Sequence, residues 1–157
     1  MEITVNLFRP DQLKDFMDLL DVLYFDQDAR FRFEYDLFDI NEYREHYLRL
    51  REYNVFIAKT NGSMIGFMIG EHLSNKIYDI KILYVHPEFR RAGVARKLKQ
   101  ALVDHATEKG YELIQSKVRT NNKESIALNH SFGWTEERDT LRPEWYYWYF
   151  KELKNVK

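Results

Sequence analysis

A short stretch of small and basic residues carries the clearest chemical signal in this sequence. Arg90-Arg91-Ala92-Gly93-Val94-Ala95 lies between a predicted strand and a predicted long helix. The first N–H groups of a helix have no intrahelical partner and the helix dipole is positive there, so such a junction binds anions. The small residues let the backbone approach a phosphate, and Arg90, Arg91, Arg96 and Lys97 supply charge. The expected ligand is a diphosphate, although a solvated basic turn would have the same composition.

A second candidate stretch runs from Asn122 to Trp134. Its apolar residues are followed by Gly133, which is typical of a helix end, so a short helix is predicted from Lys123 to Phe132. Asn122 comes just before this helix and fits a helix cap. The two stretches therefore give two strand-to-helix junctions in one chain.

Together these stretches resemble the GNAT family of N-acetyltransferases. The pyrophosphate loop of that family reads Arg/Gln-x-x-Gly-x-Gly/Ala, which Arg90, Gly93 and Ala95 match, and residues 83–90 (LYVHPEFR) resemble the strand and loop before it. The resemblance covers about residues 55 to 135 well and the ends only in the order of elements.

The downstream motif of the family departs here at three positions. The family pattern is Asn-x-x-Ala-x-x-Leu-Tyr-x-x-x-Gly-Phe, and this chain has Ser125 for Ala, Asn129 for Tyr and Trp134 for Phe. The resemblance implies an α/β (α+β) fold: a single domain over residues 1–157 with a mixed, mostly antiparallel seven-stranded sheet, about four flanking helices and a splayed central strand pair.

Hydrophobic periodicity predicts the elements that must position these residues. Helical spacing predicts helices after Asp11, over residues 41–51 and from Gly93 to Gly110, whereas residues 24–38 predict a loop or broken helix. Strands are expected over residues 1–8, on both sides of the hairpin signal Asn61-Gly62, and over residues 77–85, 113–118, 134–137 and 145–153. Residues 77–85 are apolar on both faces near their end, which predicts a central strand.

The resemblance also implies how acetyl-CoA binds. Leu83, Tyr84 and Val85 would offer backbone groups to the pantetheine arm, because their strand splays from the strand at residues 113–118. Asn122 and Ser125 would lie beside that arm, with a helix cap as the equal alternative for Asn122. The diphosphate would bind the N–H groups of Arg91, Ala92, Gly93, Val94 and Ala95, with charge from Arg90 and Arg96.

Acetyl transfer to an amine needs a base, because an alkylamine with a pKa near ~10.4 is protonated at neutral pH. Asp79 occupies a strand position where many family members carry Glu and is the first candidate; Glu71 and His72 are the next. The alternative is that Asp79 merely begins its strand in solvent. The N–H of Val85 is the candidate donor to the carbonyl oxygen.

The general acid is unfilled in this sequence. Asn129 stands where the family often has a Tyr that protonates the departing thiolate, and an amide is a poor proton donor. Tyr84 or a hydroxyl of the terminal aromatic strand is a substitute, or CoA leaves as a thiolate, since a thiol has a pKa near ~8.5. We therefore expect slow or acid-independent transfer, with Asn129 hydrogen-bonded to the sulfur.

Acidic and aromatic residues gather between positions 24 and 39, where the family binds its acceptor. They are Asp26, Asp28, Glu34, Asp36 and Asp39 beside Tyr24, Phe25, Phe31, Phe33 and Tyr35. Such a group suits a cationic amine through ion pairs and cation–π contacts, or it forms a charged surface over core aromatics. The acceptor stays open among small molecules (polyamine, aminoglycoside, amino acid) and protein amines (lysine or N-terminal amine).

The run Trp145-Tyr146-Tyr147-Trp148-Tyr149-Phe150 places three aromatic side chains on each face of a strand. One face is expected in the core and the other against the acceptor or a second subunit, so a homodimer is expected. Two rivals remain: a non-catalytic acyl-CoA-binding sensor, and an interaction module that docks through the acidic N-terminal part and this strand.

Composition narrows the class of protein. The 157 residues are 45% hydrophobic with a net charge of -1, which fits one globular domain and gives no nucleic-acid footprint. The absence of Cys excludes disulfides and thiolate nucleophiles. The five His residues lack paired metal spacing, so no metal is expected. Without a signal peptide or an apolar run of roughly 20 residues, we expect a cytoplasmic protein with no membrane partner.

Overall fold

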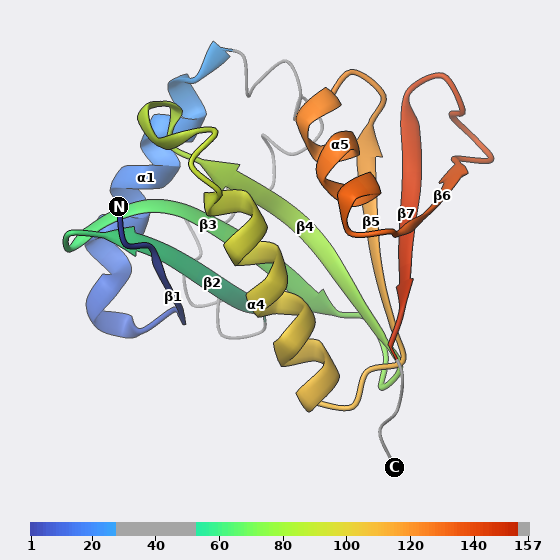
Figure 1. Ribbon diagram of the computed structural model, residues 1–157, viewed down its shortest axis with the longest axis horizontal. Helices are drawn as coiled ribbons and strands as arrows, with labels where there is room; N and C mark the ends of the chain where they lie inside the picture. The colour runs from blue at the N-terminus through green and yellow to red at the C-terminus, as the bar shows by residue number, and fades with distance from the viewer. Residues whose placement is uncertain (28–52, 154–157) are drawn as a thin grey trace.

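Seven strands form one mixed sheet in the order β1-β2-β3-β4-β5-β7-β6. The computed structural model describes residues 1–27 and 53–153 (Figure 1). Within these ranges the strands are β1 (Thr4–Leu7), β2 (Tyr53–Thr60), β3 (Ser63–His72), β4 (Ile77–Val85), β5 (Leu113–Arg119), β6 (Thr135–Arg138) and β7 (Tyr146–Glu152). The helices are α1 (Leu13–Phe25), α4 (Val94–Glu108) and α5 (Lys123–Ser131), with 3-10 turns η1 (Pro10–Gln12) and η4 (Pro87–Phe89).

All pairings are antiparallel except β4 with β5, which confirms the mixed, mostly antiparallel seven-stranded sheet. The described residues hold three α-helices, one fewer than the approximately four that were expected. The helix expected over residues 41–51, and most of the loop expected over 24–38, lie outside the described residues.

Turn residues set the boundaries of the elements near the site. Asn61 and Gly62 have φ of 49° and 80°, the left-handed pair that a tight hairpin requires, and they join β2 to β3. Gly93, with φ 83°, is the residue just before α4, and Gly110, with φ 86°, follows it. The strand, hairpin and helix bounds predicted for residues 53–110 are therefore confirmed to within a few residues.

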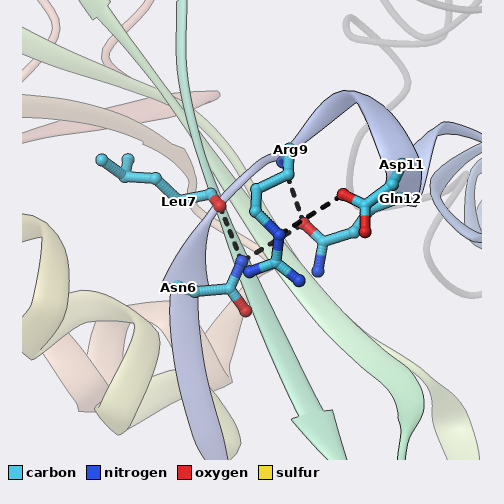
Figure 2. A network of polar contacts seen from close by, with 5 residues as sticks. All are labelled: Asn6, Leu7, Arg9, Asp11 and Gln12. Carbon is cyan, nitrogen blue, oxygen red and sulfur yellow. Dashed lines mark hydrogen bonds and ion pairs between the residues drawn. The ribbon is translucent and has the colours of Figure 1, made fainter.

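A small polar network fixes the turn from β1 into α1 (Figure 2). The Gln12 side-chain oxygen accepts hydrogen bonds from the Arg9 backbone N–H at 2.9 Å and from Asn6 Nδ2 at 3.2 Å. Arg9 Nε forms an ion pair with Asp11 at 3.3 Å. The turn directs the apolar stripe of α1 onto the sheet, where Phe16, Leu19, Leu20 and Leu23 are buried.

The helices α1 and α4 cover opposite faces of the sheet. The α1 residues share one apolar cluster with Ile82 and Tyr84 of β4. The α4 residues Val94, Leu98, Leu102 and Ala106 share the other cluster with Tyr78 and Ile80 of the same strand. None of the helices in residues 1–27 and 53–153 is both long and apolar enough to span a bilayer.

A bulge in β4 explains why Ile80 and Ile82, two residues apart, pack on opposite faces. In the pairing with β3, Ile69 faces Ile82 and Gly70 faces Ile80, so Lys81 is the extra residue. A bulge of this kind re-aims the side chains around it. It lies where the site described below begins.

The parallel strands β4 and β5 pair only at one end. Their register runs from Ile77 opposite Leu113 to Ile80 opposite Ser116 and stops there, although β4 continues to Val85 and β5 to Arg119. Beyond that point the two strands diverge, and α5 lies beside the opening (Figure 1). The splayed central pair is confirmed, and it leaves edge groups of both strands available within the sheet.

Candidate functional site

A groove of about 590 Å³ runs along the end of β4 and the start of α4. Loop residues Arg91, Gly93, Val94, Ala95 and Arg96 line one side of it. Arg91 and Gly93 both have positive φ values, 65° and 83°, and this backbone form is known from anion-binding concavities. The loop predicted to hold a diphosphate therefore borders a groove at a helix N-terminus. Ala92 of the same loop is exposed.

The other walls of this groove come from the residues expected to contact a pantetheine arm. Leu83, Tyr84 and Val85 line it from β4, and Asn122 and Ser125 line it from α5. Asn122 is buried, with 4% of its surface exposed, and its side chain accepts a hydrogen bond from the Ser125 N–H at 3.3 Å. Asn122 is thus a helix cap that also lines the groove, and its contact with a pantetheine arm stays a prediction.

Arg90 belongs to a network that the sequence did not indicate. Its Nη2 pairs with Asp26 Oδ2 at 2.8 Å, and its Nε donates to the Val85 carbonyl at 3.2 Å. The Tyr84 hydroxyl donates to the same Asp26 oxygen at 2.9 Å. Burial, with the Asp26 contact, raises the pKa of Tyr84. The network ties the end of α1 to β4 and to the loop.

A second cavity, of about 290 Å³, lies where β4 and β5 separate. Leu83, Asn122, Ser125 and Leu128 line both this cavity and the groove, so the two spaces adjoin. A long ligand with its anionic end on the loop would reach this cavity with its other end.

Asp79 lines the second cavity and is only 5% exposed, so it does not begin its strand in solvent. Lys81 Nζ lies 3.0 Å from Asp79 Oδ2 and 3.2 Å from Glu71 Oε2. Burial raises the pKa of Asp79, and Lys81 opposes the rise only in part. Burial acts to lower the pKa of Lys81, but the attraction of Asp79 and Glu71 outweighs it and the pKa is raised.

The other two candidate bases lie differently. Glu71 pairs with Lys81 and is not among the residues that line the second cavity. His72 is exposed, and its Nδ1 shares a 2.7 Å hydrogen bond with the Tyr111 hydroxyl. Of the three residues, Asp79 is the one at the cavity.

Lys99 is a cavity residue that the sequence analysis did not single out. It is buried, with 3% exposed, and its Nζ donates to the Asn129 side-chain oxygen and lies 3.7 Å from the centre of the Trp134 ring. Burial lowers the pKa of Lys99 to about 7. A signal was present, since Lys99 precedes Leu102 by three residues and Ala106 by seven, which places it on the buried face of the helix.

The aromatic strand β7 divides its side chains as expected. Tyr149 packs in the cluster on the α4 side, with Tyr147 against it. Tyr146 and Trp148 line the second cavity, and Lys117 Nζ lies over their rings, 4.6 Å and 5.6 Å from the ring centres. Most of the acidic and aromatic acceptor group, Asp28, Phe31, Phe33, Glu34, Tyr35, Asp36 and Asp39, lies outside the described residues.

The cavity between β4 and β5 has a basic lining. Lys81, Lys99, Lys117 and Arg119 border it, against one carboxylate, Asp79. In the two ranges that the structure describes, no three His, Asp or Glu side chains come together in a way that would hold a metal ion. The site chemistry is therefore that of amines, guanidinium groups and one buried carboxylate.

Comparisons with known proteins point to one family. A family model described as "Acetyltransferase (GNAT) family" matches residues 13–134. The chain is 31% identical over 91 residues to the L-methionine sulfoximine/L-methionine sulfone acetyltransferase of Salmonella typhimurium, a match that covers 55% of this chain and 53% of that protein. It is also 31% identical over 91 residues to the ribosomal protein bS18-alanine N-acetyltransferase of Escherichia coli, with 58% and 60% covered.

A solved structure supports the fold over nearly the whole chain. A putative acetyltransferase from Salmonella typhimurium, solved with its cofactor acetyl-CoA, superposes with a TM-score of 0.71 at 18% identity, covering 98% of this chain and 95% of that one. The sequence matches to the two curated relatives span little more than half the length of each.

Proposed function

The chain belongs to the GNAT acetyltransferase family, and from this we propose that it transfers an acetyl group from acetyl-CoA to an amine by direct attack in a ternary complex. The observation that carries the proposal is the pair of adjoining spaces. The groove at the start of α4 leads past Leu83 and Asn122 into the cavity that holds Asp79. A donor with a diphosphate at one end and a thioester at the other has this shape.

The loop supplies the donor site in this proposal. N–H groups of residues 91–95 and the helix dipole bind the diphosphate, with charge from Arg91 and Arg96. Arg90 holds the loop in place through Asp26 and the Val85 carbonyl. The diverging edge of β4 at Leu83 to Val85 pairs with the amides of the pantetheine arm, since backbone groups at an open edge need partners.

Two groups of this chain are assigned to the acceptor amine and the thioester carbonyl. Only the neutral amine is a nucleophile. Asp79, when ionised, therefore removes a proton from the acceptor ammonium before the attack, either directly or through one water. The Val85 N–H donates to the carbonyl oxygen as negative charge builds there. The raised pKa of Asp79 brings this base closer to neutrality, where general bases work best.

We infer that the acceptor is an amine that also carries a carboxylate, such as an amino acid. The described cavity residues include four bases and a single acid, Asp79, a lining that attracts an anionic group. Tyr146 and Trp148 add aromatic surface for an apolar side chain. One of the relatives is named for the amino acid derivatives methionine sulfoximine and methionine sulfone.

The test is release of free CoA thiol from acetyl-CoA, followed with a thiol-reactive dye. The panel of acceptors contains amino acids, their methyl esters, polyamines, aminoglycosides and lysine peptides. Since the chain has no Cys, it contributes no thiol background. We expect release with amino acids and little with the matching esters, which lack the carboxylate.

Other outcomes of the same panel would overturn specific parts of the proposal. Release with polyamines or esters alone would contradict the carboxylate assignment and leave acetyl transfer intact. Tight acetyl-CoA binding with no release for any acceptor would favour the acyl-CoA sensor instead. Binding is measured separately by calorimetry, so that a failure to bind and a failure to react are distinguished.

A further inference from the structure

Lys99 is a buried cation at the inner end of the proposed donor path. It lines the cavity between β4 and β5 but not the outer groove. The residues shared by both spaces, Leu83, Asn122, Ser125 and Leu128, are those a ligand must pass to reach it. A thioester delivered through the groove therefore arrives in the space that Lys99 borders.

The contacts of Lys99 hold its amine in place without neutralising it. The Nζ donates to the Asn129 side-chain oxygen and lies 3.7 Å from the centre of the Trp134 ring and 5.6 Å from that of Phe132. Among the described residues, ion pairs to Asp79 and Glu71 are made by Lys81 rather than by Lys99. A cation over an aromatic face, with a single neutral acceptor, keeps protons available for another partner.

Resting on the proposed acetyl transfer, we propose that the Lys99 ammonium is the general acid that protonates the CoA sulfur when the thioester breaks. In the step, the amine nitrogen forms a bond to the carbonyl carbon and the C–S bond breaks with its electron pair going to sulfur. A proton moves from Lys99 Nζ to that sulfur. The acceptor ammonium loses two protons in all: Asp79 takes one before the attack, and the second leaves the nitrogen as the amide forms. One of them returns to Lys99 through solvent and the other is released to solvent, so no further reactant is needed.

The order of acidities favours this direction of transfer. An ordinary lysine, with a pKa near ~10.4, holds its proton about 100-fold more tightly than a thiolate with a pKa near ~8.5. Burial reverses the order, because it lowers the pKa of Lys99 to about 7. The other ionisable groups that border the cavity are Asp79 and Lys81 from β4 and Lys117 and Arg119 from β5, and they do not account for this lowering, which is due to burial.

Asn129 and Tyr84, the residues assigned to the thioester sulfur by the sequence analysis, fit the role less well. Asn129 has only amide protons, which are not acidic, so its contribution is to hold Lys99. The Tyr84 hydroxyl donates to Asp26 at 2.9 Å and packs with the α1-side cluster. Its pKa is raised, which makes its proton harder to release.

The first experiment measures the pKa of the CoA thiol in the binary complex, which requires no turnover. Thiolate absorbance of bound CoA is followed from pH 6 to 9, with desulfo-CoA as the blank, in the wild type, in Lys99→Met and in the control Lys76→Met, an exposed lysine. NMR titration of the Lys99 methylene next to Nζ gives the pKa of Lys99 in the same complex. We expect the bound thiol of all three proteins to ionise at least about one pKa unit above Lys99, because neutral Lys99 does not stabilise the thiolate. A thiol that ionises below Lys99, or at a much lower pH in the wild type than in Lys99→Met, would overturn the proposal, because Lys99 would then keep its proton.

The second experiment separates proton donation from a charge effect. Lys99→Arg keeps a cation that cannot release its proton. We expect kcat to fall about 10²- to 10⁴-fold in both Lys99→Met and Lys99→Arg, with little change in the KM for acetyl-CoA. We also expect the decline of the wild-type kcat at high pH to be absent in both variants. A Lys99→Arg protein as active as the wild type would overturn the proposal.

The two experiments also distinguish this proposal from the proposed function. A Lys99 pKa below that of the bound thiol, without transfer to any acceptor, would refute the acetyltransferase and leave the order of acidities intact. Transfer with a Lys99 pKa above that of the bound thiol would do the reverse. Should the variants fail to fold, the wild type alone decides, because the comparison of its two pKa values needs no variant: a Lys99 pKa above the thiol pKa contradicts the proposal.

Discussion

At the scale of single residues, the site shifts the pKa of a carboxyl group and the pKa of an amine toward neutrality, the first upward and the second downward. Burial raises the pKa of Asp79 and lowers that of Lys99 to about 7. Titratable groups with perturbed pKa values that line a cleft are candidates for the acid and base of a reaction. The two side chains come from different elements, β4 and α4, and both border the cavity beside β5.

Replacing Asp79 by Asn removes the proposed base and preserves its shape. We expect kcat to fall about 10²- to 10⁴-fold. In the wild type kcat should rise with pH through the raised pKa of Asp79, because the base works only when ionised, and the variant should lose this limb. The control is Glu71→Gln, which also removes a carboxylate from Lys81; a larger loss in the control than in Asp79→Asn would contradict the assignment.

Lys99 should make the stability of the protein depend on pH. Its pKa is about 7 in the folded state and near ~10.4 when unfolded, so between these values the unfolded chain binds more protons and the free energy of unfolding rises with pH. The slope from this one group is at most about 1.4 kcal/mol per pH unit. Urea unfolding between pH 7.5 and 9 should show a smaller slope in Lys99→Met than in Lys76→Met, and equal slopes would count against a buried cation.

At the scale of elements, the site depends on where β4 stops pairing with β5 and where α4 begins. The last register pair is Ile80 with Ser116, and the bulge at Lys81 follows at once. Gly93 then starts α4 so that the helix N-terminus borders the groove. The two adjoining spaces thus result from one interrupted strand pair and one turn.

Two glycines of similar geometry allow a matched test of that turn. Gly93 and Gly62 have φ of +83° and +80°, and a Cβ on either would meet no atom within 4 Å. Ala at each position should therefore cost a similar amount of stability, on the order of 1 kcal/mol. Only Gly93→Ala should weaken acetyl-CoA binding, by about tenfold or more in Kd, since a shifted loop loses charge-assisted hydrogen bonds. Equal Kd values for the two variants would place the diphosphate elsewhere.

Most helices and strands could be predicted from local sequence patterns. Asn61-Gly62 predicted the hairpin, Gly93 and Gly110 predicted the limits of α4, and the apolar run of residues 77–85 predicted a central strand, because each depends on neighbouring residues only. The short helix after Asn122 was predicted for the same reason.

The contacts between distant residues that complete the site could not be predicted from local sequence patterns. Asp26 meets Arg90 across 64 positions of sequence, and Lys99 meets Asn129 across 30. No local pattern specifies such pairs, which follow from how α1, α4 and α5 dock on the sheet. The helical spacing of Lys99 did indicate the buried face of α4, but a lysine close to Arg96 and Lys97 is equally typical of a solvated basic surface.

At the scale of the whole molecule, the sheet is covered by α1 on one face and α4 on the other. The loop before α4 is tied to two other helices. Arg90 pairs with Asp26 at the end of α1, and Arg96 Nη2 donates to Ser131 of α5 at 2.7 Å. Movement of α1 or α5 would therefore move the loop. The homodimer expected from the aromatic strand stays a prediction that sedimentation in solution would test.

Substitution of two phenylalanines of α1 would show how much the packing of α1 stabilises the fold. Phe16 is fully buried and its ring centre lies 5.2 Å from that of Phe67 in β3, whereas Phe25 is 74% exposed. We expect Phe16→Ala to lower the free energy of unfolding by about 3–5 kcal/mol and Phe25→Ala to change it by less than about 0.5 kcal/mol. Chemical denaturation gives both numbers; a mild effect at Phe16 would mean that α1 contributes little to the core.

The position of β7 in the sheet has a consequence for synthesis on the ribosome. Strand β7 lies between β5 and β6 and pairs with both, yet it is translated after them. Until β7 is synthesised, the edge of β5 away from β4 and both edges of β6 have no partner strand among the described residues, and such open edges can pair with wrong partners. Tyr146 and Trp148 arrive with β7, so the cavity between β4 and β5 lacks part of its lining until β7 has left the exit tunnel.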